Sequence, residues 1–524
     1  MKKTIFFTLL NLYLTGVLGQ STFQKAYGTN LQDAASQIIQ TNNGDFMLCG
    51  YSLGYGASGD IVAVRIDTNG NFKSVKDFFG VGADVEKNIC QDHSNGFAIV
   101  GFTFSFGTGN RDGIFIKTDS AGHVQHSMTY GSASGYDDFD CIERLSNGYI
   151  IGGSTTFSPI NGTLIIRTDT VGTAMWAIML PTASSADQIR SIHQVGDGGF
   201  VLLSGTDNWY SASFSVIKID SLGNFKWARQ YSVSTSMGVY KMKATKDKGF
   251  IITGATDQNG VGASADILLV KTDSMGNPKW FKTYGGIAGE YGFDVIQTYE
   301  GGYAITGYTQ SFGFGGNDAF LLKTDSAGTC TWAKTYGDVW DDKAESLIQT
   351  SDMGYVMAGE KYMYGTNLDS INVYVIKADS TGHTGCRDTA WQVVTHNPSY
   401  IKTNVTYTPN AYGSVTYPTV VSSAKSFNTR ELCNITGIES FDNKESFSIY
   451  PNPFSYSTTL HFSEEVENLT LEISDCLGQT IRKIKPEPGN DILLQRNGLN
   501  PGIYFLRLCQ DGKIVDAKKF IIAD

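Results

Sequence analysis

Residues 290–337 contain one complete copy of the unit that decides the fold, EYGFDVIQTYEGGYAITGYTQSFGFGGNDAFLLKTDSAGTCTWAKTYG. Its most recognisable part is a glycine turn followed by an aromatic residue and a short apolar run, here Gly302-Tyr303-Ala304-Ile305. The same phrase occurs seven times along the chain, as GDFMLCG, GFAIVGFT, GYIIGGST, GFVLLSGT, GFIITGAT, GYAITGYT and GYVMAGEK. The chain is therefore a tandem repeat.

The aromatic residues of the seven copies set the period of the repeat. They are Phe46, Phe97, Tyr149, Phe200, Phe250, Tyr303 and Tyr355. The first and the last lie 309 residues apart over six intervals, which gives a mean period of 51.5 residues. A period of this length is typical of a solenoid, a propeller or an array.

Each copy offers four short strands, which we label A to D. Strand B is the aromatic phrase, strand A is an alternating run before it, and strand C is an apolar run that ends in a basic residue. Strand D is a W-x-K-x-Y-G run such as 332–337. No copy has a sustained apolar period of 3.6, which excludes a helical solenoid. These features predict an all-β fold, a propeller of four-stranded blades, and leave a long β-solenoid as the alternative.

The two ends of the repeat region predict a closed ring of seven blades. The seventh copy stops after strand C, at 377–382, and has no strand D of its own. The chain carries an orphan copy of that strand at Phe23–Gly28, before the first repeat. Closure with this strand would remove exposed sheet edges, which invite aggregation. We therefore expect the propeller to span residues 20–382.

Composition and the N-terminus indicate an exported chain. The net charge of −11 disfavours nucleic acid as a partner, because phosphate binding needs a basic face. Residues 1–19 combine Lys2 and Lys3 with a mostly apolar stretch, which predicts a signal peptide that is cleaved before Gln20. No later segment is apolar for long enough to predict a transmembrane helix. We expect the mature protein to be secreted or bound at the cell surface.

The eight cysteines include no C-x-x-C pair, so a zinc knuckle or a thioredoxin motif is unsupported. Cys386 and Cys433 bracket a segment outside the repeats. They are the best candidates for a disulfide, which an exported chain can form. The remaining pairings stay open.

Strand direction sorts the connections onto two faces, a turn face with the A–B and C–D turns and a loop face with the longer B–C and D–A loops. Binding residues are expected on the loop face. An acidic residue recurs there thirteen positions before the strand B aromatic, with Asp137 shifted by one: Asp33, Asp84, Asp187, Glu290 and Asp342. These carboxylates either pin the loops by accepting backbone hydrogen bonds or ring the channel and bind a cation such as calcium.

A second repeated feature of the loop face is an aromatic residue nine positions after the strand B aromatic. The residues are Tyr55, Phe106, Trp209, Phe312 and Tyr364. The third copy has Phe157 one position earlier, and the fifth has Asn259 instead. These rings either wedge between blades as buried apolar groups or stay exposed as a platform for sugar rings or a partner surface.

The sequence contains no catalytic constellation that we can identify. The seven histidines show no H-E-x-x-H spacing, and no G-x-S-x-G elbow occurs. Two carboxylates of the acidic set could lie at glycosidase distance. The D-x-x-G-x-x-x-W hairpin, as at 325–332, resembles the sialidase Asp-box and the quinoprotein repeat. Both resemblances are partial, and they imply a propeller fold alone.

The C-terminal region departs from the repeat. Residues 383–446 are rich in Thr, Ser, Asn, Val and Pro, and we expect an extended segment and a linker there. From Phe447, renewed alternation predicts a small β-sandwich over 447–524.

The same 78 residues resemble the C-terminal sorting domain of type IX secretion substrates from the Bacteroidota. The Y-P-N-P opening at 450–453, the D-x-x-G-Q turn at 475–479, the G-I-Y-x-L strand at 502–506 and the basic-apolar ending at 518–524 carry this resemblance, in this order. It implies passage through outer-membrane secretion machinery, removal of the domain, and attachment to surface lipopolysaccharide or release.

The sequence thus predicts an exported propeller protein that acts as a binding or adhesion module for a glycan or a protein. The alternatives are a propeller enzyme that acts on polysaccharide or uses a quinone cofactor, and a purely structural surface protein. Turnover of polysaccharides would favour the enzyme, and saturable binding without turnover would favour the module.

Overall fold

The computed structural model describes residues 21–523 except 30, 56–58, 109, 133–134, 157–161, 182–186, 207–211, 258–263, 364–369, 387, 392, 407–409, 412–413, 417–420, 426–427, 436–446, 467–468, 475–479, 488 and 511–512. Every named element in this part of the chain is a β-strand. No helix among the described residues is long and apolar enough to cross a membrane. The chain forms two compact units, Met1–Gly437 and Ile438–Asp524, which we describe separately. The predicted signal peptide lies outside the described residues.

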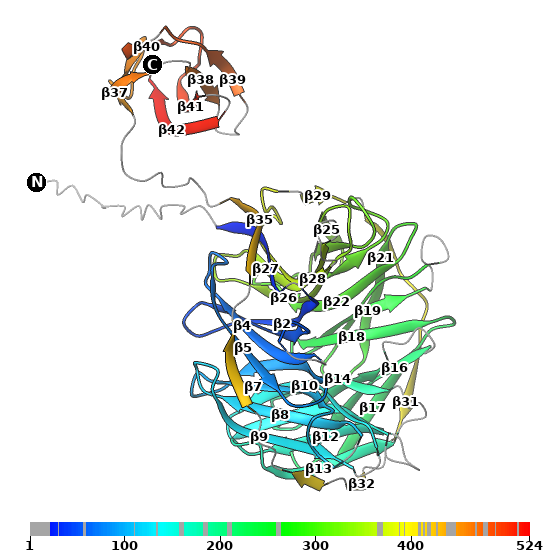
Figure 1. Cartoon of the computed structure of the whole chain (residues 1–524). Coiled ribbons are helices and arrows are strands. Elements are labelled where there is room, and N and C mark those ends of the chain that lie inside the picture. The colour runs from blue at the N-terminus through cyan, green and yellow to red at the C-terminus, as the bar shows by residue number, and fades with distance from the viewer. Residues whose placement is uncertain are drawn as a thin grey trace, which may run out of the picture. The chain divides into compact units, whose positions relative to one another are not determined.

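The first unit is a seven-bladed β-propeller, as predicted, built from seven antiparallel sheets (Figure 1). The innermost strand of each blade contacts the innermost strands of the two neighbouring blades, and β2 contacts both β6 and β26, so that the ring is closed. These innermost strands correspond to strand A and are β2 (Asp33–Gln40), β6 (Asp84–Gln91), β10 (Asp137–Leu145), β14 (Gln188–Gln194), β18 (Met237–Ala244), β22 (Glu290–Gln297) and β26 (Asp342–Gln349).

The next two strands outward correspond to strands B and C. Strand B is β3 (Phe46–Ser52), β7 (Phe97–Thr103), β11 (Gly148–Thr155), β15 (Phe200–Gly205), β19 (Phe250–Thr256), β23 (Tyr303–Thr309) and β27 (Tyr355–Met363). Strand C is β4 (Asp60–Ile66), β8 (Asp112–Thr118), β12 (Gly162–Thr168), β16 (Ser213–Ile219), β20 (Asp266–Thr272), β24 (Asp318–Thr324) and β28 (Ser370–Ala378).

The fourth strand of each blade corresponds to strand D. In the first six blades it is β5 (Phe72–Phe79), β9 (Val124–Gly131), β13 (Ala174–Pro181), β17 (Phe225–Ser232), β21 (Pro278–Gly285) and β25 (Cys330–Tyr336). In the seventh blade it is β1 (Thr22–Gly28), which pairs antiparallel with β28 so that Phe23 faces Lys377. The last blade therefore takes its fourth strand from the N-terminus.

Apolar side chains on both faces of each blade form the core. Among the described residues, seven hydrophobic clusters lie between neighbouring blades. In β20, Leu268 packs in the cluster on one face and Leu269 in the cluster on the other. The cluster that joins the seventh blade to the first contains Phe23 and Tyr27 of β1. Strand C is apolar at successive positions because both of its faces are buried.

In five of the seven blades, a tyrosine of strand D links the blade to the next one. Tyr336 donates a hydrogen bond to the Gly382 carbonyl at 2.6 Å, and Tyr27 donates one to the Gly70 carbonyl at the same distance. Both glycines lie in the turn that follows a strand C and have φ values of 79° and 73°, a region that favours glycine. The W-x-K-x-Y-G and D-S-x-G signatures are therefore two halves of one contact between blades.

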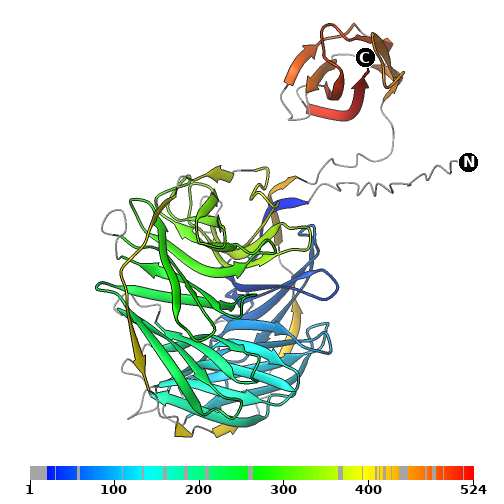
Figure 2. The same ribbon diagram turned by 180° about the vertical axis from the view of Figure 1, so that it is seen from behind.

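A fifth strand on every blade is the main departure from the predicted four-stranded architecture. The segment 388–435, which we call the belt, runs once around the outside of the ring in the reverse order of the blades (Figures 1 and 2). Its strands, from the sixth blade through the first to the seventh, are β29 (Asp388–Ala390), β30 (Val394–His396), β31 (Ile401–Val405), β32 (Asn410–Ala411), β33 (Ser414–Thr416), β34 (Val421–Lys425) and β35 (Asn428–Ile435).

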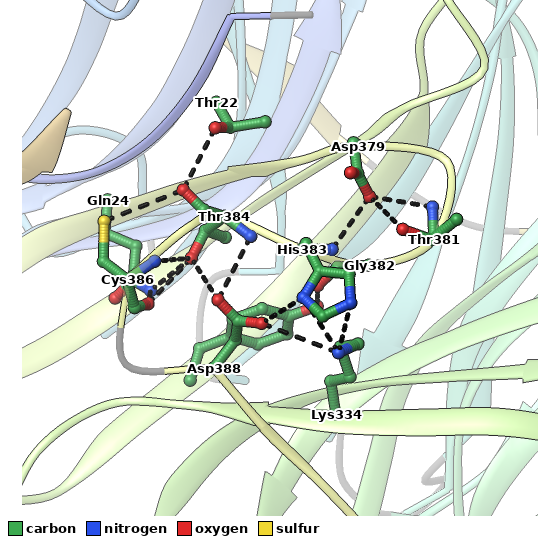
Figure 3. A network of polar contacts seen from close by, with 11 residues as sticks. Thr22, Gln24, Lys334, Asp379, Thr381, Gly382, His383, Thr384, Cys386 and Asp388 are labelled. Carbon is green, nitrogen blue, oxygen red and sulfur yellow. Dashed lines mark hydrogen bonds and ion pairs between the residues drawn. The ribbon is translucent and has the colours of Figure 1, made fainter. Parts of the chain in front are cut away.

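The belt begins at a polar network that joins it to β1 (Figure 3). Thr22 donates a hydrogen bond to the Thr384 carbonyl at 3.0 Å, and Gln24 Nε2 donates to Thr384 Oγ1 at 2.9 Å. The Asp388 carboxylate accepts a hydrogen bond from His383 Nδ1 at 2.7 Å. These contacts tie the belt to the strand that completes the seventh blade.

Cys386 is disulfide-bonded and lies in this network. Its carbonyl accepts a hydrogen bond from the Gln24 side chain, and the backbone of Gln24 faces Cys433 of β35 across the sheet. The two ends of the belt thus approach the same residue of β1. The pairing of Cys386 with Cys433 stays a prediction, and Cys49, Cys90, Cys141 and Cys330 are free.

The second unit is a small β-sandwich, as predicted. One sheet has the order β36-β37-β40 and the other the order β39-β38-β41-β42. Phe462 of the first sheet and Leu471, Leu506 and Phe520 of the second share one hydrophobic cluster. The strands are β36 (Phe447–Tyr450), β37 (Ser457–Val466), β38 (Leu469–Ser474), β39 (Thr480–Ile484), β40 (Gly489–Gln495), β41 (Gly502–Gln510) and β42 (Lys513–Ile522).

Candidate functional site

All seven innermost strands carry a β-bulge at the same place, where one residue has no partner on strand B. A bulge re-aims a side chain and is common beside functional sites. The bulged residues are Ser36, Lys87, Asp140, Arg190, Tyr240, Phe293 and Glu345. Because these strands line the central channel, the bulges gather charged and aromatic residues there.

The repeated acidic residues lie where the innermost strands begin. Asp33, Asp84, Asp137, Glu290 and Asp342 are buried, and Asp187 is half-buried. Glu290 shows the common arrangement, because it accepts hydrogen bonds from the Gly286 N–H at 2.8 Å and from the Thr309 hydroxyl at 2.9 Å. It thereby joins its own D–A loop to the end of strand B. Burial raises the pKa of Glu290, as it does for Asp33, Asp84 and Asp187.

The seventh blade varies this arrangement. Lys361 replaces the strand B hydroxyl and donates to Asp342 Oδ1 at 2.7 Å, while the Asp338 N–H donates to Asp342 Oδ2 at 2.9 Å. Lys361 also lies 3.1 Å from Asp338 Oδ2. Burial raises the pKa of Asp342 to about 7, although Lys361 lowers it. In each blade for which contacts are described, the carboxylate therefore bonds to its own loop, which is the geometry of loop pinning.

Calcium binding by these carboxylates stays a prediction. Among the residues that the structure describes, no group of three or more His, Cys, Asp or Glu side chains is arranged to hold a metal ion.

The predicted aromatic set of the loop face is described at three positions. Tyr55 and Phe106 are half-buried and pack on the clusters that join the first blade to its two neighbours. Phe312 is also half-buried, and its ring centroid lies 4.7 Å from that of Trp391, which precedes β30 of the belt. Trp209 and Tyr364, as well as Phe157 and Asn259, lie outside the described residues. The three described rings have the wedge geometry, and their role in ligand binding stays a prediction.

A different set of aromatic side chains gathers at the loop-face end of the channel, and we call it the aromatic mouth. Its members are half-buried and are Tyr51, Phe102, Tyr240, Tyr291, Phe293, Tyr308 and Tyr362. They come from the first halves of innermost strands and from the ends of strands B. These two parts of a blade face each other across the sheet, as Tyr291 faces Tyr308. The mouth therefore combines residues of six segments of the chain.

Ring contacts connect the fifth, sixth and seventh blades within the aromatic mouth. Tyr240 meets Phe293 edge to face with centroids 4.9 Å apart, and Tyr291 stacks on Tyr308 at 4.7 Å. Lys343 Nζ of the seventh blade lies 5.7 Å from the ring centroid of Tyr308. It lies at the same distance from the ring of Tyr362. The rings thus form a nearly continuous arc with a cation above them.

Charged groups complete the mouth. On the second blade, the Arg111 guanidinium lies 4.5 Å from the Phe102 ring and forms an ion pair with Asp138. Burial raises the pKa of the Asp138 carboxyl to about 6. Burial also raises the pKa of Glu86 and of Glu345 to about 7, with the Glu360 carboxylate adding to the effect at Glu345. These carboxyl groups can donate or accept a hydrogen bond near neutral pH.

Exposed apolar residues also occur on the D–A and B–C loops of the same face. They include Val81, which is 94% exposed, and Ile287, which is 78% exposed. Among the described residues of these loops, the rim consists of Leu31, Val81, Phe104, Tyr136, Ile287, Phe314, Val339 and Trp340. Exposed apolar groups that gather on one face mark an interaction site.

Sequence reasoning missed the aromatic mouth, although a signal was present. The fifth residue after the strand B aromatic is Tyr51, Phe102, Tyr308 and Glu360 in four copies. This residue faces the second residue of strand A across the sheet, as Lys343 faces Glu360. The bulged positions have no comparable signal, because a bulge breaks the alternation from which strand faces are predicted.

Comparisons with known proteins bear on the two units separately. Residues 448–523 match the family described as the secretion system C-terminal sorting domain. This match confirms the predicted sorting domain and indicates export to the cell surface or beyond it, which implies contact with the secretion machinery.

No curated protein matches the chain. The crystal structure of Sqt1 from Chaetomium thermophilum is similar at 10% identity and a TM-score of 0.40, over 68% of this chain and 99% of that one. The sheet order shows a seven-bladed β-propeller, and the family match shows that residues 448–523 of the same chain form a secretion system C-terminal sorting domain.

Proposed function

We propose that this protein is an exported binding module that takes carbohydrate at the aromatic mouth of the propeller. The observation that carries the proposal is the arc of half-buried rings beside Lys343, Glu345 and Glu360, within a rim of exposed apolar residues. The C–H face of a sugar ring packs on an aromatic plane, and its hydroxyls bond to carboxylate and ammonium groups. Export by the sorting domain would present this face to polymers outside the cell.

The test is binding of the mature chain to a panel of soluble polysaccharides, measured by affinity electrophoresis and by calorimetry. We expect saturable binding to at least one of them. Replacing Trp340 or Tyr308 by Ala should weaken binding about tenfold, which corresponds to the loss of about 1.4 kcal/mol. Tyr299→Ala is the matched control, because Tyr299 is an exposed aromatic residue in the A–B turn of the same sixth blade.

The controls separate a sugar site from other outcomes. Melting temperatures of the variants show whether the propeller is intact, and Trp340 is the more informative position because its side chain is exposed. Binding that survives Trp340→Ala and Tyr308→Ala would overturn the proposed mouth. Binding to cells that persists after enzymatic removal of their surface glycans would indicate a protein partner instead.

The enzyme alternative has one supporting observation. Glu345 lies at the bulge of an innermost strand, and burial raises the pKa of its carboxyl to about 7, a value suited to general acid catalysis at neutral pH. Reducing ends that accumulate from a bound polysaccharide would favour an enzyme. We would then expect Glu345→Gln to abolish turnover while binding persists.

A further inference from the structure

The other end of the channel, on the turn face, holds a cavity of different character. Its volume is 560 Å³, within the range of roughly 300–1,000 Å³ that is usual for small-molecule sites. The last residues of five innermost strands line it, from the first blade to the fifth. Lys241 Nζ of the fifth blade donates a hydrogen bond to Gln37 Oε1 of the first blade at 3.3 Å, so this contact between two lining residues joins blades that are not neighbours in the ring.

The cavity is strongly cationic for its size. Arg144, Arg190, Lys241 and Lys243 line it, and Glu143 is the carboxylate among the lining residues. The Glu143 carboxylate is already engaged, because it accepts hydrogen bonds from His193 Nδ1 at 2.7 Å and from the Gln194 N–H at 2.9 Å. This concentration of positive charge occurs in a chain whose net charge is −11. It is therefore a local feature of the site and does not follow from the overall charge.

The four cations differ in how far neighbouring groups compensate them, and the Asp294 and Asp140 carboxylates partly offset the effect of burial on Lys241. Lys243 Nζ makes no hydrogen bond or ion pair with a described residue, and its charge helps to lower the pKa of Lys241, after burial. Arg190 forms an ion pair with Asp140 Oδ1 at 3.9 Å, and Arg144 donates to the Gln91 carbonyl at 3.1 Å. Like charges held close together favour a bound ion of opposite sign.

The opposite wall supplies neutral hydrogen-bonding groups. The carboxamides of Gln37, Gln40, Asn88 and Gln91 come from the first two blades and line the same cavity. Carboxamides both donate and accept, so they match hydroxyl groups, whereas lysine and arginine only donate and so match anionic oxygens. The cavity thus has a cationic side and an amide side.

We propose that the turn-face cavity binds a sugar anion of about monosaccharide size, with its carboxylate or phosphate on the side of Arg144, Arg190, Lys241 and Lys243 and its hydroxyls on the carboxamides. Carboxylates and phosphates share the oxygens that such cations recognise, and the hydroxyls would distinguish a sugar from a simple ion. This site is separate from the aromatic mouth and does not depend on the function proposed there.

Calorimetry on the mature chain in 50 mM NaCl tests the proposal with four probes. We expect glucuronate or glucose 6-phosphate to bind at least tenfold more tightly than glucose, and the sugar anion to bind more tightly than inorganic phosphate. The two sugar anions distinguish a carboxylate site from a phosphate site. Equal affinities for glucose and the sugar anions would overturn the proposal, and equal affinities for glucose 6-phosphate and inorganic phosphate would overturn its sugar part.

Variants locate the site. Lys243→Gln should weaken binding of the sugar anion about tenfold, the loss expected for one charge-assisted hydrogen bond. It should leave the melting temperature of the free protein unchanged, because Lys243 has no partner to lose. Lys226→Gln, which removes an exposed lysine of β17 outside the cavity, is the control for net charge. Binding that is weakened equally by both variants would overturn the assignment to this cavity.

Discussion

The sixth and seventh blades have the same five-stranded sheet, but the chain assembles them in different ways. The sixth takes strands A to D from one continuous stretch, β22 to β25, and adds β29 from the start of the belt. The seventh takes only three consecutive strands, β26 to β28, then β1 from the N-terminus and β35 from the end of the belt. The first and last strands of the first unit therefore lie in the same sheet.

This difference places the closure of the ring and the closure of the belt on the same strand. β1 pairs with β28 on one side and with β35 on the other, and all seven of its residues are buried. Contacts such as that of Tyr374 with Gln24 join residues 350 positions apart, whereas the sixth blade is built from local hairpins. Because the closure of long loops costs conformational entropy, we expect the seventh blade to be the weakest part of the ring.

Deletion of Thr22–Gly28 should destabilise the seventh blade more than any other change considered for the two blades. It removes Phe23 and Tyr27 from the core between the seventh and first blades, and each large aromatic residue lost from a core costs about 3–5 kcal/mol. It also exposes the edges of β28 and β35. We expect the melting temperature to fall by many degrees or the protein to aggregate, as scanning calorimetry and light scattering would show. A chain that starts at Thr29 and melts like the mature protein would refute closure by β1.

Opening the belt should have the next largest effect. If Cys386 pairs with Cys433, the disulfide closes the belt into a covalent loop around the propeller, and its loss should cost about 4 kcal/mol in the chain-entropy model. Cys386→Ser, Cys433→Ser and the double variant should then lower the unfolding free energy equally, as measured in denaturant. Cys90→Ser, at a free half-buried cysteine, serves as the control. Unequal losses in the two single variants would argue against this pairing.

The pH dependence of stability should also distinguish the two blades. Burial raises the pKa of Asp342 to about 7, above the ordinary value of about 3.9 in the unfolded chain. The contribution of this carboxyl to stability is therefore fully present below pH 4 and is lost as the pH rises through 7. Asp342→Asn should remove this loss, so that the unfolding free energy of the variant falls less between pH 4 and pH 8 than that of the native protein, on top of a pH-independent cost from the lost partner of Lys361.

The matched substitution in the sixth blade is Glu290→Gln. The pKa of Glu290 is also raised, but the Thr309 hydroxyl and the Gly286 N–H stabilise its charged form. We expect a change of the same sign and smaller size in urea titrations at pH 4, 6 and 8. A native protein whose unfolding free energy is flat between pH 4 and 8 would contradict the raised pKa of Asp342.

The tyrosine contacts between blades should give the smallest effect and the closest comparison. Tyr336→Phe removes the hydrogen bond from the sixth blade to Gly382, and Tyr27→Phe removes the one from the seventh blade to Gly70. Each change leaves a buried carbonyl without its donor and should cost about 1–2 kcal/mol. Equal losses in denaturant would show that the closing interface is as well formed as an internal one. A negligible loss in Tyr27→Phe alone would show that it is not.

The ring was predictable because the same pattern is written seven times. Strand C has no polar face, since Leu268 and Leu269 enter different cores, and the strand D signature contains the tyrosine that binds the next turn. Each of these requirements selects particular residue types, apolar residues in strand C and tyrosine in strand D, so it can be detected in the sequence. The sorting domain was predictable for another reason, because its turns and strands follow a known order of motifs.

The strands of the belt have no comparable sequence pattern. Its strands add to the blades through backbone hydrogen bonds, which any residue except proline can form. β31 is almost entirely exposed along Ile401–Val405, and β32 has only two residues, so neither strand shows an alternation that could be detected. The composition of 383–446 therefore predicted an extended segment and could not assign it to the sheets that it joins.

The sequence by itself determined the repeat, the number of blades, the all-β class and the sorting domain, because burial on two faces and tight turns constrain residue type at fixed spacing. Only the tertiary structure decided which side chains meet. The bulges of the innermost strands bring Tyr240, Phe293 and Glu345 to the loop-face mouth, and strands about 50 residues apart in sequence bring Arg144, Arg190 and Lys243 to one cavity. Side chains so far apart converge through the curvature of the closed ring, a property of the whole fold that no local pattern encodes.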